Sequence, residues 1–248
     1  MNERSAVLMA AGMGTRMRPL TEKTAKPLVE VKGRRMIETV IDGLHAADVH
    51  RIFVVTGYKH EQFDFLEDKY EGLKVLVNTK YKTVNNISSV HRISSASKEE
   101  LSGYSMGDDD LFICEADLYI PDPSVFKSTP DFSVYFGKMV KGFSDDWVFE
   151  TGDDGYISRV GKKGTDLYNM CGISFFKAAD ASILKDVINK TCEEPGYEDL
   201  FWDDAVNMNL KKLRLKVHPI GERDITEIDS IAELAEVDPS YKSMLEGV

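Results

Sequence analysis

Apolar and polar residues in the first half of the chain alternate between two spacings. Continuous apolar runs predict four buried strands, at residues 6–10, 51–56, 74–78 and 111–116. Apolar residues at helical spacing predict two helices between them, at residues 36–47 and 61–70. Because strands and helices alternate along this half, the pattern predicts a mostly parallel sheet with helices on both faces.

The second half of the chain has a more mixed pattern. Short strand-like segments separated by turns occur at residues 132–139, 148–151, 156–160, 170–176 and 214–218. Helical spacing occurs at residues 178–189 and 198–210, and a last helix begins at about Ile231. These strands predict a small antiparallel addition, with a β-ribbon over the sheet. Since the sequence contains no internal repeat or linker, it predicts one α/β domain that spans residues 1–248.

The charge balance and the cysteine content narrow the class of protein. The 248 residues carry a formal net charge of −11, which argues against a nucleic-acid partner. The apolar runs are shorter than the ~18 residues of a membrane span, and the one near the N-terminus is too short for a signal peptide. The three cysteines are widely spaced, which favours neither a disulfide framework nor a metal motif. We therefore expect a cytoplasmic protein, with Cys114 and Cys171 as buried thiols.

Basic residues are concentrated in one segment of this acidic chain. Residues 16–35 contain seven lysines and arginines against two acids. Such a segment indicates either a confined anion site or a solvated basic loop. The segment follows the first predicted strand, and residues 7–28 read VLMAAGMGTRMRPLTEKTAKPL.

The glycine turn at the start of this segment is a candidate anion site. Gly12 and Gly14 allow the backbone to approach a ligand closely, and successive N–H groups in such a turn bind anions. Arg16, Arg18 and Lys26 then bring positive charge to the same anion. A dinucleotide-binding fingerprint would need a third glycine near position 17, and the GxxxxGK[ST] phosphate loop is absent. The full pattern, GxGTRxRPxTxxxxKPL, is much more specific than a GxG turn.

This full pattern resembles the signature of the sugar-phosphate nucleotidyltransferases and their cytidylyltransferase relatives. Four further segments resemble the bacterial CTP:phosphocholine cytidylyltransferases, at residues 55–70, 81–89, 199–204 and 227–230. The resemblance implies a single Rossmann-like α/β domain, Mg²⁺ as cofactor, and the reaction of CTP with phosphocholine to give CDP-choline and pyrophosphate. It also implies that the N-terminal half binds the nucleotide and the C-terminal half binds a small zwitterionic phosphate or phosphonate acceptor.

The resemblance assigns roles to particular residues of this chain. Both reactants are anionic, so charge neutralisation and in-line positioning are the main tasks, and Arg16 and Lys26 are the candidate catalytic cations. The implied nucleotide-binding residues are Leu8, Ala10, Ala11, Gly12, Gly14, Thr15, Arg16, Lys26, Asn86 and Ser89. The amide and hydroxyl of Asn86 and Ser89 could equally serve a turn or a helix N-cap.

Two aspartates are the candidate catalytic metal ligands. Asp117 follows the fourth strand, at the sheet edge where open α/β sheets bind ligands, although it could instead cap a turn. Asp229 could instead cap the last helix, but Ser230 and Glu233 already form a capping box there. Glu227 lies two residues before Asp229, so in a strand both carboxylates face the same side. The resemblance favours Mg²⁺ ligation by Asp117 and Asp229, and solvated surface acids are the alternative.

An acidic and aromatic segment at residues 197–204 indicates a cationic acceptor. A quaternary ammonium is bound by aromatic faces and carboxylates, since it lacks N–H donors. The candidate acceptor-binding residues are Trp147, Tyr168, Phe201, Asp203 and Glu227, with Trp202 as a further candidate wall. The same acids suit a helix N-terminus, and the aromatic residues could instead belong to the core. Phe201 stands where the resemblance leads us to expect tyrosine.

Three other functions fit parts of this pattern. A CTP:2-aminoethylphosphonate cytidylyltransferase shares the loop and the metal pair, and its primary ammonium needs carboxylates more than an aromatic cage. A sugar-1-phosphate nucleotidyltransferase would need polar groups spread across the acceptor pocket. A non-catalytic nucleotide-binding regulator would not need Arg16, Lys26, Asp117 and Asp229 together. The sequence does not indicate an oligomeric state.

Overall fold

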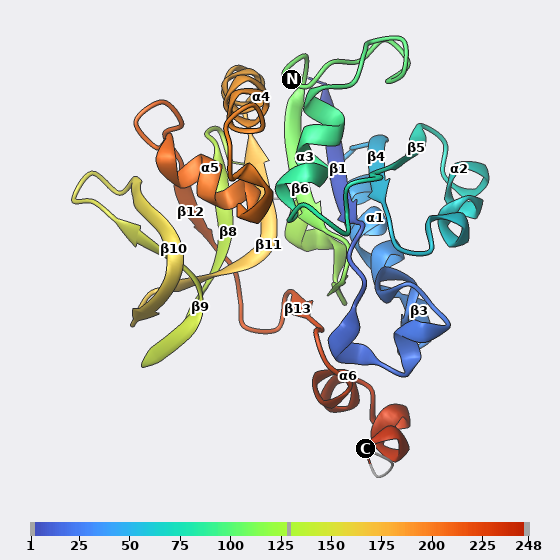
Figure 1. The fold of residues 1–248 in the computed structure, drawn as a ribbon. Helices are drawn as coiled ribbons and strands as arrows, with labels where there is room; N and C mark the ends of the chain where they lie inside the picture. The colour runs from blue at the N-terminus through green and yellow to red at the C-terminus, as the bar shows by residue number, and fades with distance from the viewer. Residues whose placement is uncertain (1–2, 128–129, 246–248) are drawn as a thin grey trace.

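A mixed β-sheet runs through the middle of the protein, with helices on both of its faces (Figure 1). The computed structural model describes residues 3–127 and 130–245. Within them the main sheet has nine strands in the order β10-β9-β11-β6-β1-β4-β5, with β8 paired to β11 and β12 paired to β8. The strands are β1 (Arg4–Ala10), β4 (Arg51–Thr56), β5 (Leu73–Val77), β6 (Asp110–Glu115), β8 (Val134–Met139), β9 (Phe143–Thr151), β10 (Ile157–Thr165), β11 (Tyr168–Phe176) and β12 (Lys216–Pro219). The expected α/β fold is confirmed.

Four adjacent strands, β6, β1, β4 and β5, form the parallel half of the sheet. The register places Leu8 of β1 between Val54 of β4 and Cys114 of β6. These side chains are fully buried, which explains why the strands read as continuous apolar runs in the sequence. Because the four strands are parallel, the segments that follow β1 and β6 leave the sheet side by side at one edge.

Helices cover the two faces of this sheet. On one face, α1 (Met36–Ala46) and α2 (Phe65–Lys69) bury their apolar side chains in a first core cluster. On the other face, α3 (Ile87–Ser94), α4 (Ala178–Thr191) and α5 (Trp202–Met208) pack into a second core cluster. Among the described residues, helices of the length and apolar character that a membrane crossing requires are not found.

Two helices begin later than their apolar spacing predicts. The helix expected at residues 198–210 starts only at Trp202, because the chain is extended at Phe201. The side chain of Asp204 accepts a hydrogen bond from Phe201 N at 2.9 Å, so this acid caps the helix and sets its start. In the helix expected at residues 61–70, a 3-10 turn occupies the first residues and precedes α2.

The antiparallel half of the sheet is built on β11, which pairs with β6, β8 and β9. Its pairing with β8 is irregular between Met170 and Ser174, where Gly172 has a φ of +68°. A side chain at Gly172 would meet Glu115 Oε2 and Leu118 Cδ2 at 3.1 Å, so β11 passes close to the end of β6. Beyond β11, the strands β9 and β10 form an antiparallel ribbon, but it extends the edge of the main sheet, whereas the sequence predicted a ribbon over the sheet.

Two small antiparallel sheets lie outside the main sheet. One pairs β2 (Glu30–Val31) with β3 (Arg34–Arg35). The other pairs β7 (Leu118–Tyr119) with β13 (Thr226–Glu227), and α6 (Ile231–Val237) follows β13 (Figure 1). The second pairing joins the segment after β6 to a segment near the end of the chain, and it brings acidic residues of both together.

Candidate active site

The segment that follows β1 folds back on itself through three short 3-10 turns. Gly14 has a φ of +60°, and a side chain there would meet Lys26 Cβ at 2.9 Å and Thr21 Cγ2 at 3.0 Å. Thr21 Oγ1 also donates a hydrogen bond to Gly14 O at 2.8 Å. A glycine at this position therefore allows Lys26 to lie directly against the turn.

The structure separates the predicted nucleotide-binding residues into two groups. The side chains of Leu8 and Ala10 lie in the first core cluster, beneath the loop. A methyl group added at Gly12 would meet nothing within 4 Å, so this part of the turn is open. The remaining eight residues line one cleft: Ala11, Gly12, Gly14, Thr15, Arg16, Lys26, Asn86 and Ser89.

Lys26 is a buried cation held between two carboxylates. Its Nζ lies 2.6 Å from Asp117 Oδ2 and 2.5 Å from Asp229 Oδ1. Burial disfavours the charged ammonium, but the two carboxylates outweigh this effect and raise the pKa of Lys26. Arg16 Nη2 also lies 2.8 Å from Asp229 Oδ1, although the Arg16 side chain is 70% exposed. The predicted catalytic residues are therefore in direct contact with one another.

A short strand pairing and a helix cap place the acidic residues. Ile228 is fully buried between Glu227 and Asp229, and its N–H donates to Asp117 O at 3.3 Å. The two flanking carboxylates consequently face the same cleft as Asp117. The predicted capping box of Ser230 and Glu233 is present. Asp229 is therefore not needed as the helix cap, and its side chain contacts Lys26 and Arg16 instead.

The acidic residues have the arrangement that a divalent cation requires. One carboxylate oxygen from each of Asp117, Glu227 and Asp229 lies within 4.8 Å of the others. Among the described residues, Asp117 Oδ1 is buried and lacks a hydrogen-bond partner, so it is an acceptor still open to a cation. Hard carboxylate oxygens are the ligands that Mg²⁺ prefers. The three residues therefore fit a metal of this kind.

Two carboxyl groups in the cleft, those of Glu227 and Glu115, have raised pKa values. Desolvation, followed by the charges of Asp117 and Asp229, raises the pKa of Glu227 to about 8. Glu115 lies at the end of β6, and desolvation and the charge of Glu227 raise its pKa well above the usual value. Sequence reasoning missed Glu115, although an acid at the end of the apolar run of residues 111–116 was a signal for it.

The N-terminus of α3 forms the cleft wall that faces the glycine turn. Asn78 Nδ2 donates to Ser88 Oγ at 2.8 Å and to Ser89 Oγ at 3.3 Å, so these hydroxyls are fixed from behind. Asn86 Oδ1 accepts a hydrogen bond from Trp202 N at 3.0 Å, which joins α3 to the start of α5. Sequence reasoning missed Asn78 and Tyr81, which also line the cleft.

The predicted acceptor-binding aromatic residues do not all lie together. Trp147 and Phe201 line the cleft, with ring centroids 5.4 Å apart in an edge-to-face arrangement. Trp202 is instead a core residue, stacked on Tyr135 at 5.7 Å, because its side chain projects into the second core cluster. Tyr168 starts β11 and packs at the margin of that cluster, outside the lining of the cleft. A contact between Tyr168 and the acceptor therefore stays a prediction.

Asp203 is a buried carboxyl at the edge of the cleft. It is 3% exposed, and Tyr135 Oη donates a hydrogen bond to its Oδ1 at 3.0 Å. Desolvation outweighs this hydrogen bond and raises the pKa of Asp203 to about 7. The predicted counter-charge is therefore partly protonated near neutral pH.

A lysine that sequence reasoning missed lies at the aromatic pair. The Nζ of Lys162 lies 5.7 Å from the centroid of Trp147 and 5.1 Å from that of Phe201. Lys162 is the cross-strand neighbour of Trp147 in the β9–β10 ribbon. Because the neighbour of a strand residue depends on register, this contact has no signal in the local sequence.

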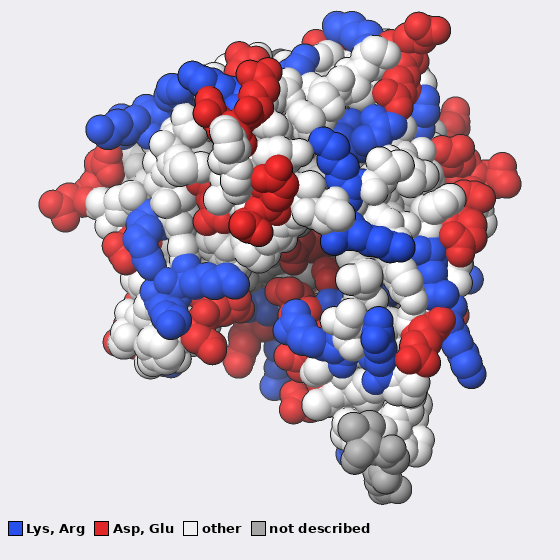
Figure 2. Space-filling view, in the orientation of Figure 1, with Lys and Arg blue, Asp and Glu red and all other residues white. Residues whose placement is uncertain are grey.

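The predicted site residues line one cleft of about 560 Å³, with the exception of Leu8, Ala10, Tyr168 and Trp202. Figure 2 shows it as a hollow between the two halves of the molecule, with acidic side chains in its depth and basic side chains at its rim.

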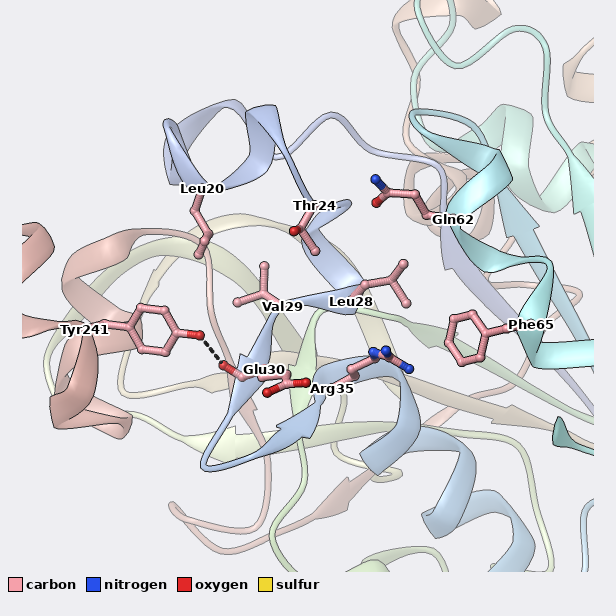
Figure 3. Close-up of a pocket in the computed structure, with 9 residues that line it drawn as sticks. All are labelled: Leu20, Thr24, Leu28, Val29, Glu30, Arg35, Gln62, Phe65 and Tyr241. Carbon is pink, nitrogen blue, oxygen red and sulfur yellow. Dashed lines mark hydrogen bonds between the residues drawn. The ribbon is translucent and has the colours of Figure 1, made fainter.

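A second cavity, of about 500 Å³, lies behind the loop, where Tyr241 Oη donates to Glu30 O at 2.9 Å (Figure 3). Its lining contains none of the predicted site residues, so the acidic cleft is the candidate active site.

Comparisons with known proteins agree with this geometry. Residues 5–120 match the family model for nucleotidyl transferases. The chain is 45% identical to a 2-aminoethylphosphonate cytidylyltransferase of Lancefieldella rimae, over 97% of this chain and 94% of that protein. It is 31% identical to a choline-phosphate cytidylyltransferase of Streptococcus pneumoniae, over 96% and 98% of the two chains. The chain belongs to the cytidylyltransferases of the nucleotidyl transferase family.

Solved structures place the fold of this cytidylyltransferase in the same family. The CTP:phosphocholine cytidylyltransferase of Streptococcus pneumoniae matches with a TM-score of 0.83 and 30% identity, over 97% of this chain and all of that one. An inositol-1-phosphate CTP transferase from T. maritima matches with a TM-score of 0.72 at 20% identity, which shows a shared fold.

The raised pKa of Asp203 predicts a pH-dependent stability of the cytidylyltransferase. Burial raises the pKa of this carboxyl from its ordinary value of 3.8, which applies to the unfolded chain, to about 7 in the folded protein. The folded state therefore holds an extra proton between these values, and its stability falls as pH rises through this window. Asp203→Asn keeps an acceptor for Tyr135 but does not ionise. The free energy of unfolding of the wild type, relative to this variant, should fall by up to about 4 kcal/mol between pH 4 and 7.5.

Urea unfolding at a series of pH values measures this difference. Asp199→Asn is the matched control, because Asp199 is an exposed acid in the same segment. Its profile should run parallel to that of the wild type. A parallel profile for Asp203→Asn would show that the Asp203 carboxyl titrates normally in the folded protein.

Proposed function

We propose that this cytidylyltransferase transfers CMP from CTP to 2-aminoethylphosphonate, with release of pyrophosphate. The observation that carries the choice of acceptor is the set of acidic side chains that line the cleft and offer carboxyl oxygens. Glu115, Asp146, Asp203 and Glu227 line it together, against the two rings of Trp147 and Phe201. A primary ammonium donates three hydrogen bonds and is best bound by such oxygens. The relative from Lancefieldella rimae, whose name states this acceptor, supports the same choice.

In the proposed reaction, a phosphonate oxygen of the acceptor attacks the α-phosphorus of CTP. A new P–O bond forms there as the bond to the pyrophosphate oxygen breaks, and the pyrophosphate leaves with the bonding electrons. No covalent intermediate with the protein is needed. Because both reactants are anionic, positioning and charge neutralisation carry the catalysis.

Arg16 and Lys26 supply the positive charge in this proposal. Arg16 pairs with Asp229 through Nη2, but its side chain is 70% exposed, so its guanidinium can still offer a triphosphate donors in a fork that fits phosphate oxygens. Lys26 is fixed by Asp117 and Asp229, so it holds a permanent charge at the base of the glycine turn. A charge pair at 4 Å is worth about 4 kcal/mol at an effective dielectric of about 20.

The metal in this proposal is Mg²⁺, held by Asp117 and Asp229 with Glu227 beside them. The orphaned Asp117 Oδ1 and the convergence of the three carboxylates support this assignment. When bound, Mg²⁺ would supply further positive charge to the phosphates. The N-terminus of α3, with Asn86 and Ser89, is our candidate for binding the base and ribose. The N-terminal half would thus bind the nucleotide and the C-terminal half the acceptor.

Phosphocholine is the second candidate acceptor. The edge-to-face pair of Trp147 and Phe201 is the kind of surface that binds a quaternary ammonium. The relatives from Streptococcus pneumoniae, whose names state phosphocholine or choline phosphate, support it too. The two candidates share the transfer chemistry. They differ in the cationic end of the acceptor, and also in its anionic end, which is a phosphonate with a C–P bond in one and a phosphate ester in the other.

Pyrophosphate release with a panel of substrates tests the proposed function. The panel crosses CTP, UTP, ATP and GTP with 2-aminoethylphosphonate, phosphocholine and several sugar 1-phosphates. We expect release with CTP and 2-aminoethylphosphonate, because the carboxylates match a primary ammonium. Release with phosphocholine alone would replace the acceptor and leave the mechanism intact. Absence of release with every pair would refute the transferase assignment.

Replacing either metal aspartate should nearly abolish turnover. We expect Asp117→Ala and Asp229→Ala each to lower kcat by about 100-fold or more and to flatten its dependence on Mg²⁺, because each removes a ligand and a partner of Lys26. Steady-state rates across a Mg²⁺ titration measure both effects. Glu236→Ala, at an exposed acid on α6, is the control and should behave like the wild type. Normal rates of the aspartate variants at saturating Mg²⁺ would remove them from the metal site.

A further inference from the structure

We propose that Lys162 occupies the aromatic pair of Trp147 and Phe201 and thereby selects acceptors with a primary ammonium over those with a quaternary one. This inference rests on the proposed function, since it concerns the choice between the two candidate acceptors. Lys162 is a specificity-determining residue in this proposal. It takes the place that a quaternary ammonium would otherwise fill.

The strand register fixes the position of Lys162. The residue lies on β10 directly opposite Trp147 of β9, so both side chains leave the same face of the ribbon. Arg159 Nη2 donates hydrogen bonds to Lys162 O at 2.7 Å and to Lys163 O at 3.4 Å. Arg159 Nη1 also pairs with Glu150 Oε1 at 2.8 Å, which ties the two strands together. The backbone that carries Lys162 is therefore held in place.

The ammonium of Lys162 lies over both rings of the pair. Its Nζ lies 5.7 Å from the Trp147 centroid and 5.1 Å from the Phe201 centroid, within the range of cation–π attraction. The two centroids are themselves 5.4 Å apart. These three distances are similar, so the ammonium and the two rings form a triangle. The position that an aromatic cage reserves for a cation is thus already filled by this chain.

Lys162 differs from the other cations of the cleft in its partners. Three cations line the cleft, and Arg16 and Lys26 are both paired with carboxylates. Among the described residues, carboxylate oxygens within ion-pairing distance of the Lys162 ammonium are absent. Lys162 is exposed to solvent, and the two aromatic rings are the contacts that the structure gives its ammonium.

This arrangement affects the two candidate acceptors differently. A quaternary ammonium carries no N–H donor, so it depends on aromatic faces and must displace Lys162 or lie beside a like charge. A primary ammonium can instead donate hydrogen bonds to the carboxyl oxygens of Asp146, Asp203 or Glu115, which also line the cleft. It can bind while Lys162 remains on the rings.

Lys162→Met tests the inference, because methionine keeps an unbranched side chain that is only one atom shorter and removes the charge. We expect the ratio of kcat/KM for phosphocholine to that for 2-aminoethylphosphonate to rise about three- to tenfold, mainly through a lower KM for phosphocholine. Lys162→Arg keeps a cation on the rings and should keep the wild-type ratio. Lys163→Met, at the neighbouring exposed lysine that does not line the cleft, is the matched control and should also keep it.

The outcomes separate this inference from the proposed function. An unchanged ratio in Lys162→Met would overturn the inference while transfer to 2-aminoethylphosphonate stands. An equal loss with both acceptors would also overturn it, and would show that Lys162 binds the anionic group that the acceptors share. A wild-type enzyme that prefers phosphocholine would contradict the proposal that Lys162 selects a primary ammonium over a quaternary one. Failure of the wild type to use either acceptor would refute the proposed function, and the inference with it.

Discussion

The contact of Lys26 with Asp117 and Asp229 holds the two halves of the candidate active site together. The three residues are far apart in sequence, with separations of 91 and 203 residues from Lys26 to the two aspartates. A buried ion pair is stable only when each charge keeps its partners, and removal of one partner typically costs about 3–5 kcal/mol. The glycine turn, the end of β6 and the segment before α6 must therefore all be in place at once. The site therefore forms cooperatively, as a folded core does.

Much of this arrangement was predictable from the sequence, because strand burial, side-chain alternation and helix capping depend on neighbouring residues. The strand at residues 51–56 was placed correctly since a parallel strand covered on both faces reads as a continuous apolar run. Spacing alone predicted that Glu227 and Asp229 share a face, because the buried Ile228 between them points the other way. Because Ser230 and Glu233 form the capping box of α6, Asp229 is not needed as its N-cap, and this too was predictable from the sequence.

The acceptor end was less predictable, because register and packing decide it. Phe201 and Trp202 are adjacent and chemically similar, yet one lines the cleft and the other fills the core. The start of α5, fixed by the Asp204 cap, determines which of them points inward. Lys162 reaches the aromatic pair only through the pairing of β9 with β10. Composition indicated that acids and aromatics would gather here, but their partners depend on tertiary contacts.

The pairing of β7 with β13 has a consequence for the newly made chain. Synthesis runs from the N-terminus, so β1, the glycine turn and β6 leave the ribosome well before β13. Until residue 229 has been made, Lys26 can contact Asp117 but still lacks Asp229. The carboxylate pair closes only when the last segment docks. The Lys26 ammonium can therefore contact both aspartates only after residue 229 has been synthesised.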